Sequence, residues 1–246
     1  MGEPVLSFDG VTRGFADGSV ALDGLDLAVG PGEMVSVVGP SGCGKTTMLR
    51  LASGLDGVTA GLVRSRADRP AFVFQEAALL PWRSTLGNVE LFGELDGVGR
   101  GARRSRAEAA LESVGLADAG HLLPSQLSVG MRMRASLARS LTVDPDLFLF
   151  DEPFAAVDEI TRVQLQDLCI GLHSESGFAA VFVTHSIAEA VYLGDRVVVL
   201  SERPGRVLAE VEVPWPRPRP AELRYTAEFA ELCGEVHRQL GSGTRR

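Results

Sequence analysis

The sequence predicts an α/β fold, in which helices cover a largely parallel sheet and to which an antiparallel β region and a helical insertion are added. Five short apolar runs each lead into a turn or a helix: Met34–Val38, Ala71–Phe74, Leu147–Phe150, Ala179–Val183 and Val197–Leu200. Runs that are apolar on both faces are typical of strands in a covered parallel sheet. Alternating, turn-rich sequence near the N-terminus predicts the antiparallel region. Alanine-rich sequence in the middle predicts the helical one.

The two added regions have clear sequence patterns. The segments VLSFDGVTRGF and LDGLDLAVGPGE carry turn residues between nearly alternating apolar positions, which predicts antiparallel strands. Between Arg100 and Leu141 the composition becomes helical. One helix face there is formed by Ala107, Ala110, Leu111 and Val114. We expect a main domain over residues 1–205, with a helical subdomain at about 86–140.

A C-terminal extension is expected over residues 206–246. It contains PWPRPRP, residues 214–220, which predicts a stiff, extended spacer. A final helix follows, with an apolar stripe made of Phe229, Leu232, Val236 and Leu240. A stripe with this spacing is typical of packing against the rest of the protein.

Composition excludes several kinds of protein. The net charge of −8 argues against a nucleic-acid partner, because a surface that follows phosphates needs a basic face. The spacing of Cys43, Cys169 and Cys233 fits neither a metal site nor a disulfide framework, so reduced thiols are expected. There is no N-terminal signal region, and no apolar run approaches the roughly 18 residues of a membrane span. We therefore expect a soluble, intracellular chain that reaches a membrane only through a membrane partner.

The segment GPSGCGKT matches the phosphate-loop pattern G-x-x-x-x-G-K-[ST] between a predicted strand and a predicted helix. Its glycines let backbone N–H groups surround an anion, and the N-terminus of the next helix attracts the same charge. Lys45 is the only lysine among 24 basic residues. It is expected to reach the β- and γ-phosphates of ATP, where arginine would crowd the loop. The sequence thus predicts a P-loop NTPase with a RecA-like core, whose nucleotide is bound by Gly39, Pro40, Ser41, Gly42, Cys43, Gly44, Lys45, Thr46 and Thr47.

Two acids end a predicted buried strand in LFLFDEP, residues 147–153. Ligands of α/β sheets bind at the carboxyl ends of the strands, so both acids are expected to face the phosphate loop. Asp151 would orient Mg²⁺ together with the Thr46 hydroxyl. Glu152 would polarise the attacking water as a general base. The alternative is two acids that cap a strand before a turn.

With these motifs in order, the chain resembles the nucleotide-binding subunit of an ATP-binding cassette transporter. The segment LSVGM, residues 127–131, lies where the family has its signature LSGGQ. The resemblance implies that Ser128 and Gly130 hold the γ-phosphate of an ATP bound mainly by the opposite subunit. Val129 and Met131 depart from the family pattern. The alternative is a serine that only caps an amphipathic helix.

Other residues are assigned roles by the same resemblance. Gln75, in FVFQEAALLPW, matches the Q-loop glutamine, which reaches toward Mg²⁺ and water and senses the membrane partner. Asp158 matches the D-loop aspartate that contacts the other subunit, and His185 matches the histidine that helps to position the water. Lys45 precedes Gln75 by only 30 residues, so we expect a β-hairpin of the family to be shortened there.

Some positions leave alternatives open. Phe15 lies where the family has an aromatic ring that stacks on adenine, but a core phenylalanine is the alternative. Trp82 either contacts a membrane subunit, together with the neighbouring Leu79, Leu80 and Pro81, or packs against the helical insertion. The remaining histidines lack such a context and are expected on the surface: His121, His173 and His237.

The resemblance implies an ATPase that uses ATP and Mg²⁺ and closes as a homodimer, or pairs with a related ATPase subunit, around two ATP molecules. Its partners would be integral-membrane permease subunits and, indirectly, an extracytoplasmic solute-binding protein. The chain would lie on the cytoplasmic face of the membrane as a peripheral subunit. FQEAALLPWRSTLGNV and the proline-rich tail resemble importers of the nitrate, sulfonate and taurine class. The alternative is a soluble ATPase of this type, or a nucleotide-dependent interaction module, with no part in transport.

Overall fold

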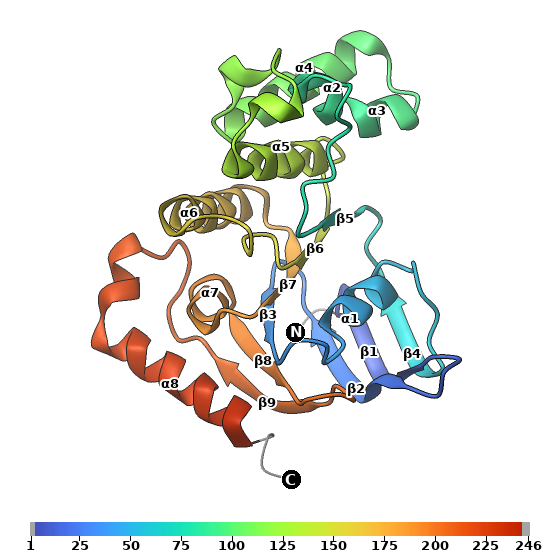
Figure 1. Ribbon diagram of the computed structural model, residues 1–246, viewed down its shortest axis with the longest axis vertical. Coiled ribbons are helices and arrows are strands. Elements are labelled where there is room, and N and C mark those ends of the chain that lie inside the picture. The colour runs from blue at the N-terminus through green and yellow to red at the C-terminus, as the bar shows by residue number, and fades with distance from the viewer. Residues whose placement is uncertain (1–2, 243–246) are drawn as a thin grey trace.

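The computed structural model describes residues 3–242 and contains two sheets (Figure 1). The larger sheet has the strand order β5-β6-β7-β3-β8-β9, with β9 antiparallel to β8 and the other neighbours parallel. The smaller sheet, β2-β1-β4, is antiparallel. The strands of the two sheets are β1 (Leu6–Gly14), β2 (Val20–Val29), β3 (Met34–Val38), β4 (Ala60–Ser65), β5 (Pro70–Val73), β6 (Leu147–Asp151), β7 (Ala179–Thr184), β8 (Arg196–Leu200) and β9 (Val207–Glu212). The five predicted strands of the large sheet are confirmed, and β4 and β9 are additions.

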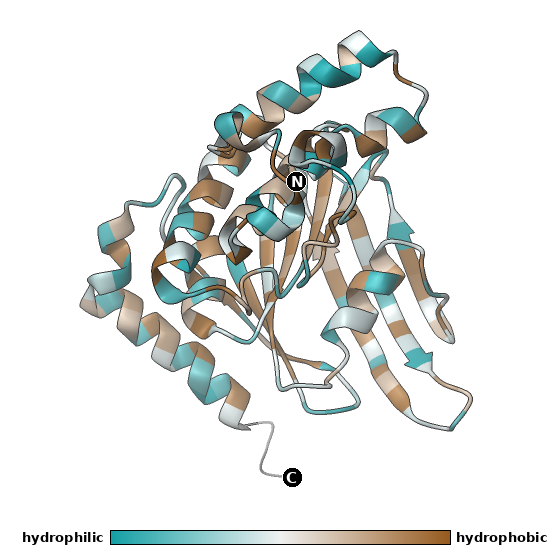
Figure 2. Cartoon of the chain, turned by 45° about the horizontal axis from the view of Figure 1, so that its top comes forward, coloured by the Kyte–Doolittle hydropathy of each residue, from teal (hydrophilic) through white to brown (hydrophobic). Residues whose placement is uncertain are grey.

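Alternate residues of the central strands face two separate hydrophobic cores. On β6, Phe148 and Phe150 belong to one core, and Leu147 and Leu149 belong to the other. The first core packs against α6 (Glu159–Ser176), α7 (Ile187–Leu193) and α8 (Ala227–Ser242), and the second against α1 (Lys45–Ala52) and the small sheet. This double coverage explains why the strands are apolar on both faces, as their brown colour shows in Figure 2.

Among residues 3–242, four α-helices form a group at one end of the molecule, at the top of Figure 1. They are α2 (Thr85–Val89), α3 (Leu91–Leu95), α4 (Arg100–Ser113) and α5 (Val129–Leu141). The expected helix face on α4 is confirmed, because Ala107, Ala110, Leu111 and Val114 are all buried. Trp82, just before α2, is 74% exposed, so it does not pack against these helices.

The C-terminal segment folds back onto the sheet. Arg219, in the proline-rich segment, is buried and donates hydrogen bonds to the carbonyl oxygens of Val191 and Tyr192 at the end of α7. On α8, Phe229 and Val236 are buried in the first core, as the apolar stripe predicts. None of the helices in residues 3–242 combines the length and the apolar character that crossing a bilayer requires.

One expectation about histidines is wrong. His173 is only 8% exposed, because its ring packs edge-on against Phe178 and its Nε2 lies 3.0 Å from the carbonyl oxygen of Gly32. Burial lowers the pKa of His173, which favours the neutral ring. His121 and His237 are exposed, as expected.

Candidate functional site

The phosphate loop connects β3 to α1, as the sequence predicts. Gly44 precedes α1 with φ of 107°, a left-handed conformation that a side chain would disfavour. The backbone of Met48 donates to Gly44 O at 2.8 Å, so the helix begins directly from the loop. The N–H groups of the first helical turn have no partner within the helix, and they make this end of α1 suited to an anion.

The Lys45 ammonium lies inside the loop and is only 5% exposed. It donates to the carbonyl oxygens of Gly39 at 2.8 Å and Pro40 at 3.1 Å. It also lies 3.6 Å from Oε1 of Glu152. A compact ammonium on a flexible stem satisfies these partners where a planar guanidinium needs more room.

The two acids lie beside the loop, at the carboxyl end of β6. The Thr46 hydroxyl donates to Oδ1 of Asp151 at 3.0 Å, which brings together two of the expected Mg²⁺ ligands. Burial raises the pKa of Asp151, and the neighbouring Glu152 charge acts in the same direction. The hydrogen bond from Thr46 and the charge of Lys45 oppose this shift. Hydroxyl and carboxylate oxygens are ligands that Mg²⁺ prefers, so the donor set fits this ion.

Glu152 lies between a cation and a histidine. Its Oε2 is 2.9 Å from Nδ1 of His185, while its Oε1 faces Lys45. Its backbone has φ of 46°, which is rare for a residue with a side chain, and its N–H donates to Val183 O at 2.9 Å. β7 ends one residue before His185, so two neighbouring strands deliver the glutamate and the histidine to the same edge of the sheet.

A hollow beside the loop has walls from four parts of the chain. It is lined by Phe15, Ala21, Ser41, Gly42, Gly44, Lys45, Thr46, Thr47, Glu152 and Arg203. Phe15 is 40% exposed, so it is not a core residue. Arg203 was missed by the sequence reasoning. The signal that identifies it is a turn, SERPGR, after β8, because β8 and β3 are parallel neighbours that end at the same edge.

The structure places the other predicted residues outside this hollow. Gln75 is exposed and follows β5. Ser128 is the N-cap of α5 and accepts from the backbone of Met131 at 3.1 Å, and Asp158 is the N-cap of α6 and accepts from the backbone of Thr161 at 3.0 Å. Ser128 therefore caps its helix whether or not it also binds nucleotide.

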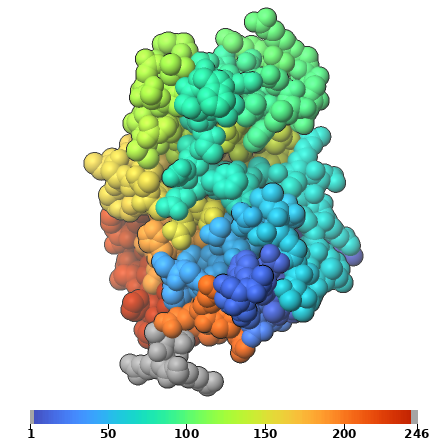
Figure 3. Space-filling view, turned by 45° about the vertical axis from the view of Figure 1, so that its right-hand side comes forward, coloured from blue at the N-terminus to red at the C-terminus, as the bar shows by residue number. Residues whose placement is uncertain are grey.

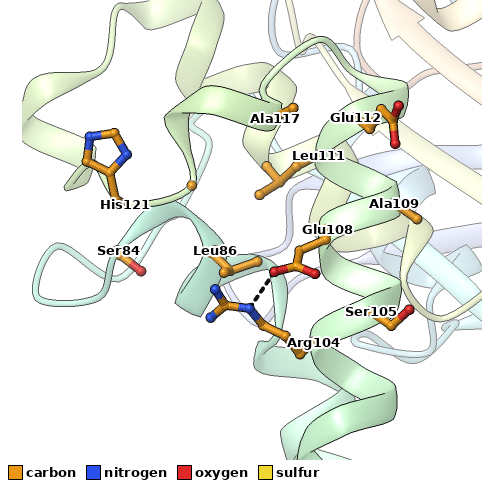
Figure 4. Close-up of a pocket in the computed structure, with 11 residues that line it drawn as sticks. Ser84, Leu86, Arg104, Ser105, Glu108, Ala109, Leu111, Glu112, Ala117 and His121 are labelled. Atoms are coloured by element: carbon orange, nitrogen blue, oxygen red, sulfur yellow. Dashed lines mark hydrogen bonds and ion pairs between the residues drawn. The ribbon is translucent and has the colours of Figure 1, made fainter.

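Another hollow, in the helical group, contains none of the predicted site residues (Figure 4). It is formed mainly by α4 and by the segments around Ser84 and His121, and it includes an ion pair between Arg104 and Glu108 at 2.7 Å. Glu108 neutralises Arg104, Glu112 adds a further carboxylate, and this hollow lacks the buried ammonium that suits the phosphate loop to an anion.

A helix-covered parallel sheet with a lysine-bearing glycine loop facing an Asp-Glu pair defines a P-loop NTPase. The profile of the family described as "ABC transporter" matches residues 22–155, more than half of the chain. The chain belongs to the ABC transporter family, and it is an ATP-binding, ATP-hydrolysing member of it.

Individual relatives cover nearly the whole chain. An aliphatic sulfonates import ATP-binding protein, SsuB 1 of Mesorhizobium japonicum, is 44% identical over 241 residues, which are 96% of this chain and 88% of the relative. SsuB of Rhodopseudomonas palustris is 43% identical over 97% of this chain and 84% of its own length. A putative ATP-binding protein of Brucella abortus is 39% identical over 95% of this chain and 92% of its own length.

Solved structures agree in fold. The ATP-binding cassette MJ0796, in a dimeric post-hydrolysis state bound to ADP and Pi, superposes with a TM-score of 0.74 and is 32% identical over 86% of this chain and all of that one. The cbiO1 protein of Clostridium perfringens, part of the cbiONQ complex, gives a TM-score of 0.80 at 20% identity over 98% of this chain and 97% of that one, a likeness of fold alone.

Proposed function

We propose that the chain is the ATPase subunit of an importer for a small sulfonate-type solute, of the class that also includes nitrate and taurine importers. The observation that carries the proposal is the full-length similarity to two sulfonate-import ATP-binding proteins, at 44% and 43% identity. Hydrolysis at the site described above supplies the free energy for transport.

The residues around the phosphate loop divide the chemistry between them. Lys45 neutralises charge on the β- and γ-phosphates, and the loop amides with the N-terminus of α1 bind their oxygens. Thr46, Asp151 and Gln75 are the residues that would hold Mg²⁺. When bound, this ion neutralises phosphate charge and helps to align the reacting groups. Phe15 stacks on the adenine.

Glu152 is the general base for the attacking water, and His185 positions it. Their 2.9 Å contact keeps the carboxylate beside the histidine, and Lys45 at 3.6 Å lies on its other side. A carboxylate between two such partners is oriented before the substrate arrives, which lowers the cost of positioning the water.

Ser128, Gly130 and Asp158 act on a second copy of the chain. They lie outside the hollow of their own chain, and both N-cap residues are at exposed ends of helices. At the start of α5, capped by the neutral Ser128, backbone amides are available to an anion. At the start of α6 the Asp158 carboxylate already accepts from the backbone, so Asp158 acts on the partner chain rather than on a phosphate. Val129, directly after the Ser128 cap, is 41% exposed, and Ile160, two residues after the Asp158 cap, is 75% exposed. Two copies that close head-to-tail place this surface over the partner's ATP, and hydrolysis removes the contacts that favour closure.

The permease contacts the surface around Gln75. Trp82 is 74% exposed. Phe74, at 43%, and Leu95, also at 74%, are exposed apolar side chains of a hollow between β5 and α3. Exposed apolar side chains gathered in this way are typical of a protein contact. The chain is therefore a peripheral subunit on the cytoplasmic face, joined through the permease to an extracytoplasmic solute-binding protein.

The test is to delete this gene from the source bacterium and to measure growth. Alkanesulfonate, taurine, nitrate and sulfate are each supplied in turn as the only source of sulfur or nitrogen. We expect loss of growth on a sulfonate and normal growth on sulfate, with rescue by the wild-type gene but not by Glu152→Gln. Normal growth on all four compounds refutes the transport assignment.

A further inference from the structure

We propose that Arg203 is a nucleotide-binding residue, which forms a second wall beside Phe15 at the base and ribose end of the ATP site. The inference rests on the proposed function, because it adds a binding residue to the same site. The guanidinium lies 5.8 Å from the centre of the Phe15 ring, and both side chains line the hollow that contains Lys45 and Thr46. Arg13 approaches the same ring at 5.2 Å.

The loop that carries Arg203 is fixed against the site by backbone hydrogen bonds. Gly205 N–H donates to Ala21 O at 2.8 Å, and Asp23 N–H donates to Gly205 O at 3.1 Å. Ser201 Oγ accepts from the backbone of Arg206 at 2.9 Å, which closes the loop on itself. In Figure 3 this orange segment lies against the blue N-terminal strands. The position of Arg203 is therefore set by the fold.

Two hydrogen bonds orient the Arg203 guanidinium, and some of its N–H donors remain for a ligand. Its Nε donates to Val20 O at 2.9 Å, and its Nη2 donates to Ser19 Oγ at 2.9 Å. Arginine has five N–H donors, so these two bonds leave others for a ligand. None of the ion pairs among residues 3–242 includes Arg203, whereas Arg206 in the same loop pairs with Asp23.

The chemistry of this wall suits a nucleotide. A planar guanidinium stacks on aromatic faces and donates to ring nitrogens and ribose hydroxyls. The base end of ATP offers all of these groups, while its phosphates belong to the loop around Lys45. Arg203 therefore recognises the part of ATP that inorganic tripolyphosphate lacks.

The experiment measures, by calorimetry, the affinities of the full chain for Mg²⁺-ATP and for inorganic tripolyphosphate. The ratio of the ATP affinity to the tripolyphosphate affinity is then compared between variants. Both ligands carry similar negative charge, so a general loss of positive charge changes both affinities and leaves the ratio intact. For Arg203→Ala we expect the ratio to fall about ten-fold, the size of one lost stacking and hydrogen-bonding contact. Arg206→Ala is the matched control and should keep the wild-type ratio. Arg203→Lys, which retains the charge and the stem, should lower the ratio in the same direction, and it replaces the alanine variant if that fails to fold.

The proposal is overturned if the affinity ratio of folded Arg203→Ala lies within two-fold of the wild-type ratio. It is also overturned if the ratio falls equally in Arg206→Ala. If wild-type chain binds no ATP, the proposed function fails instead, so the two failures are distinguishable.

Discussion

Gly130→Ala tests how the start of α5 is held against α6. A Cβ at Gly130 would lie 2.3 Å from Cγ2 of Thr161, which is closer than two carbon atoms can approach. Thr161 is β-branched and lies in the first turn of α6, so it has little freedom to turn away. Relief therefore requires a shift of the two helices.

The magnitude follows from two opposing effects. Overpacking of a close contact costs about 1–3 kcal/mol. Alanine is the better helix former and returns up to about 1 kcal/mol. We expect the free energy of unfolding of Gly130→Ala to fall by about 1–2 kcal/mol in urea denaturation. ATP turnover should fall as well, because the shift moves Ser128, the N-cap of the same helix.

Two variants make the test specific. Gly171→Ala is the matched control, because Gly171 lies within α6 and a Cβ there meets nothing within 4 Å. This variant should be as stable as wild type or more stable. Thr161→Ser removes the methyl group that clashes, so adding it to Gly130→Ala should recover most of the loss. If Gly130→Ala is as stable as Gly171→Ala, the reasoning is refuted.

The remaining predictions concern the catalytic residues. Glu152→Gln should release no phosphate and should form an ATP-dependent dimer in gel filtration; a monomer at saturating Mg²⁺-ATP contradicts the dimer mechanism. Lys45→Ala should lower ATP turnover on the order of 10²-fold or more, and unchanged turnover would remove the basis of the assignment. Because burial raises the pKa of Asp151, its charge destabilises the fold above that pKa. Asp151→Asn should therefore raise the free energy of unfolding at neutral pH. This gain in stability should shrink as the pH falls, because the wild-type carboxyl then becomes protonated. A gain in stability that is independent of pH argues against burial as the cause of the raised pKa. Glu152→Gly should be more stable than Glu152→Ala by about 1 kcal/mol in thermal or urea unfolding, since φ of 46° favours glycine; the opposite order contradicts backbone strain at this position.

The sequence predicts the core of the fold well because the signals are local. A strand covered on both faces is a continuous apolar run, and a phosphate loop must follow a strand and precede a helix. The strand β9 was missed because its alternating sequence, VLAEVE, lies in the segment that was expected to be a C-terminal extension and was not assigned to the sheet. His173 was misplaced because its partner, the carbonyl of Gly32, is 141 residues away in the chain. Arg203 was missed for the same reason, since its contacts with Ser19 and Val20 span more than 180 residues.

Glu152 shows most clearly what local patterns leave out. The DEP motif indicates an acid at the end of a strand, but it contains no sign of a left-handed backbone. Such a conformation costs of the order of 1–3 kcal/mol and persists only where the surroundings enforce it. Here Val183 accepts the N–H of Glu152 at 2.9 Å, and Ala155 donates to its carbonyl at 3.2 Å, so both sides of the strained residue are held. The result is a carboxylate directed between Lys45, the first residue of α1, and His185, which directly follows β7. The backbone strain lies at Glu152, the residue that must orient water, and the strand that delivers the histidine enforces it. A site organised for hydrolysis requires such fixed positioning. Two acids that merely cap a strand would have no reason to keep the strained conformation.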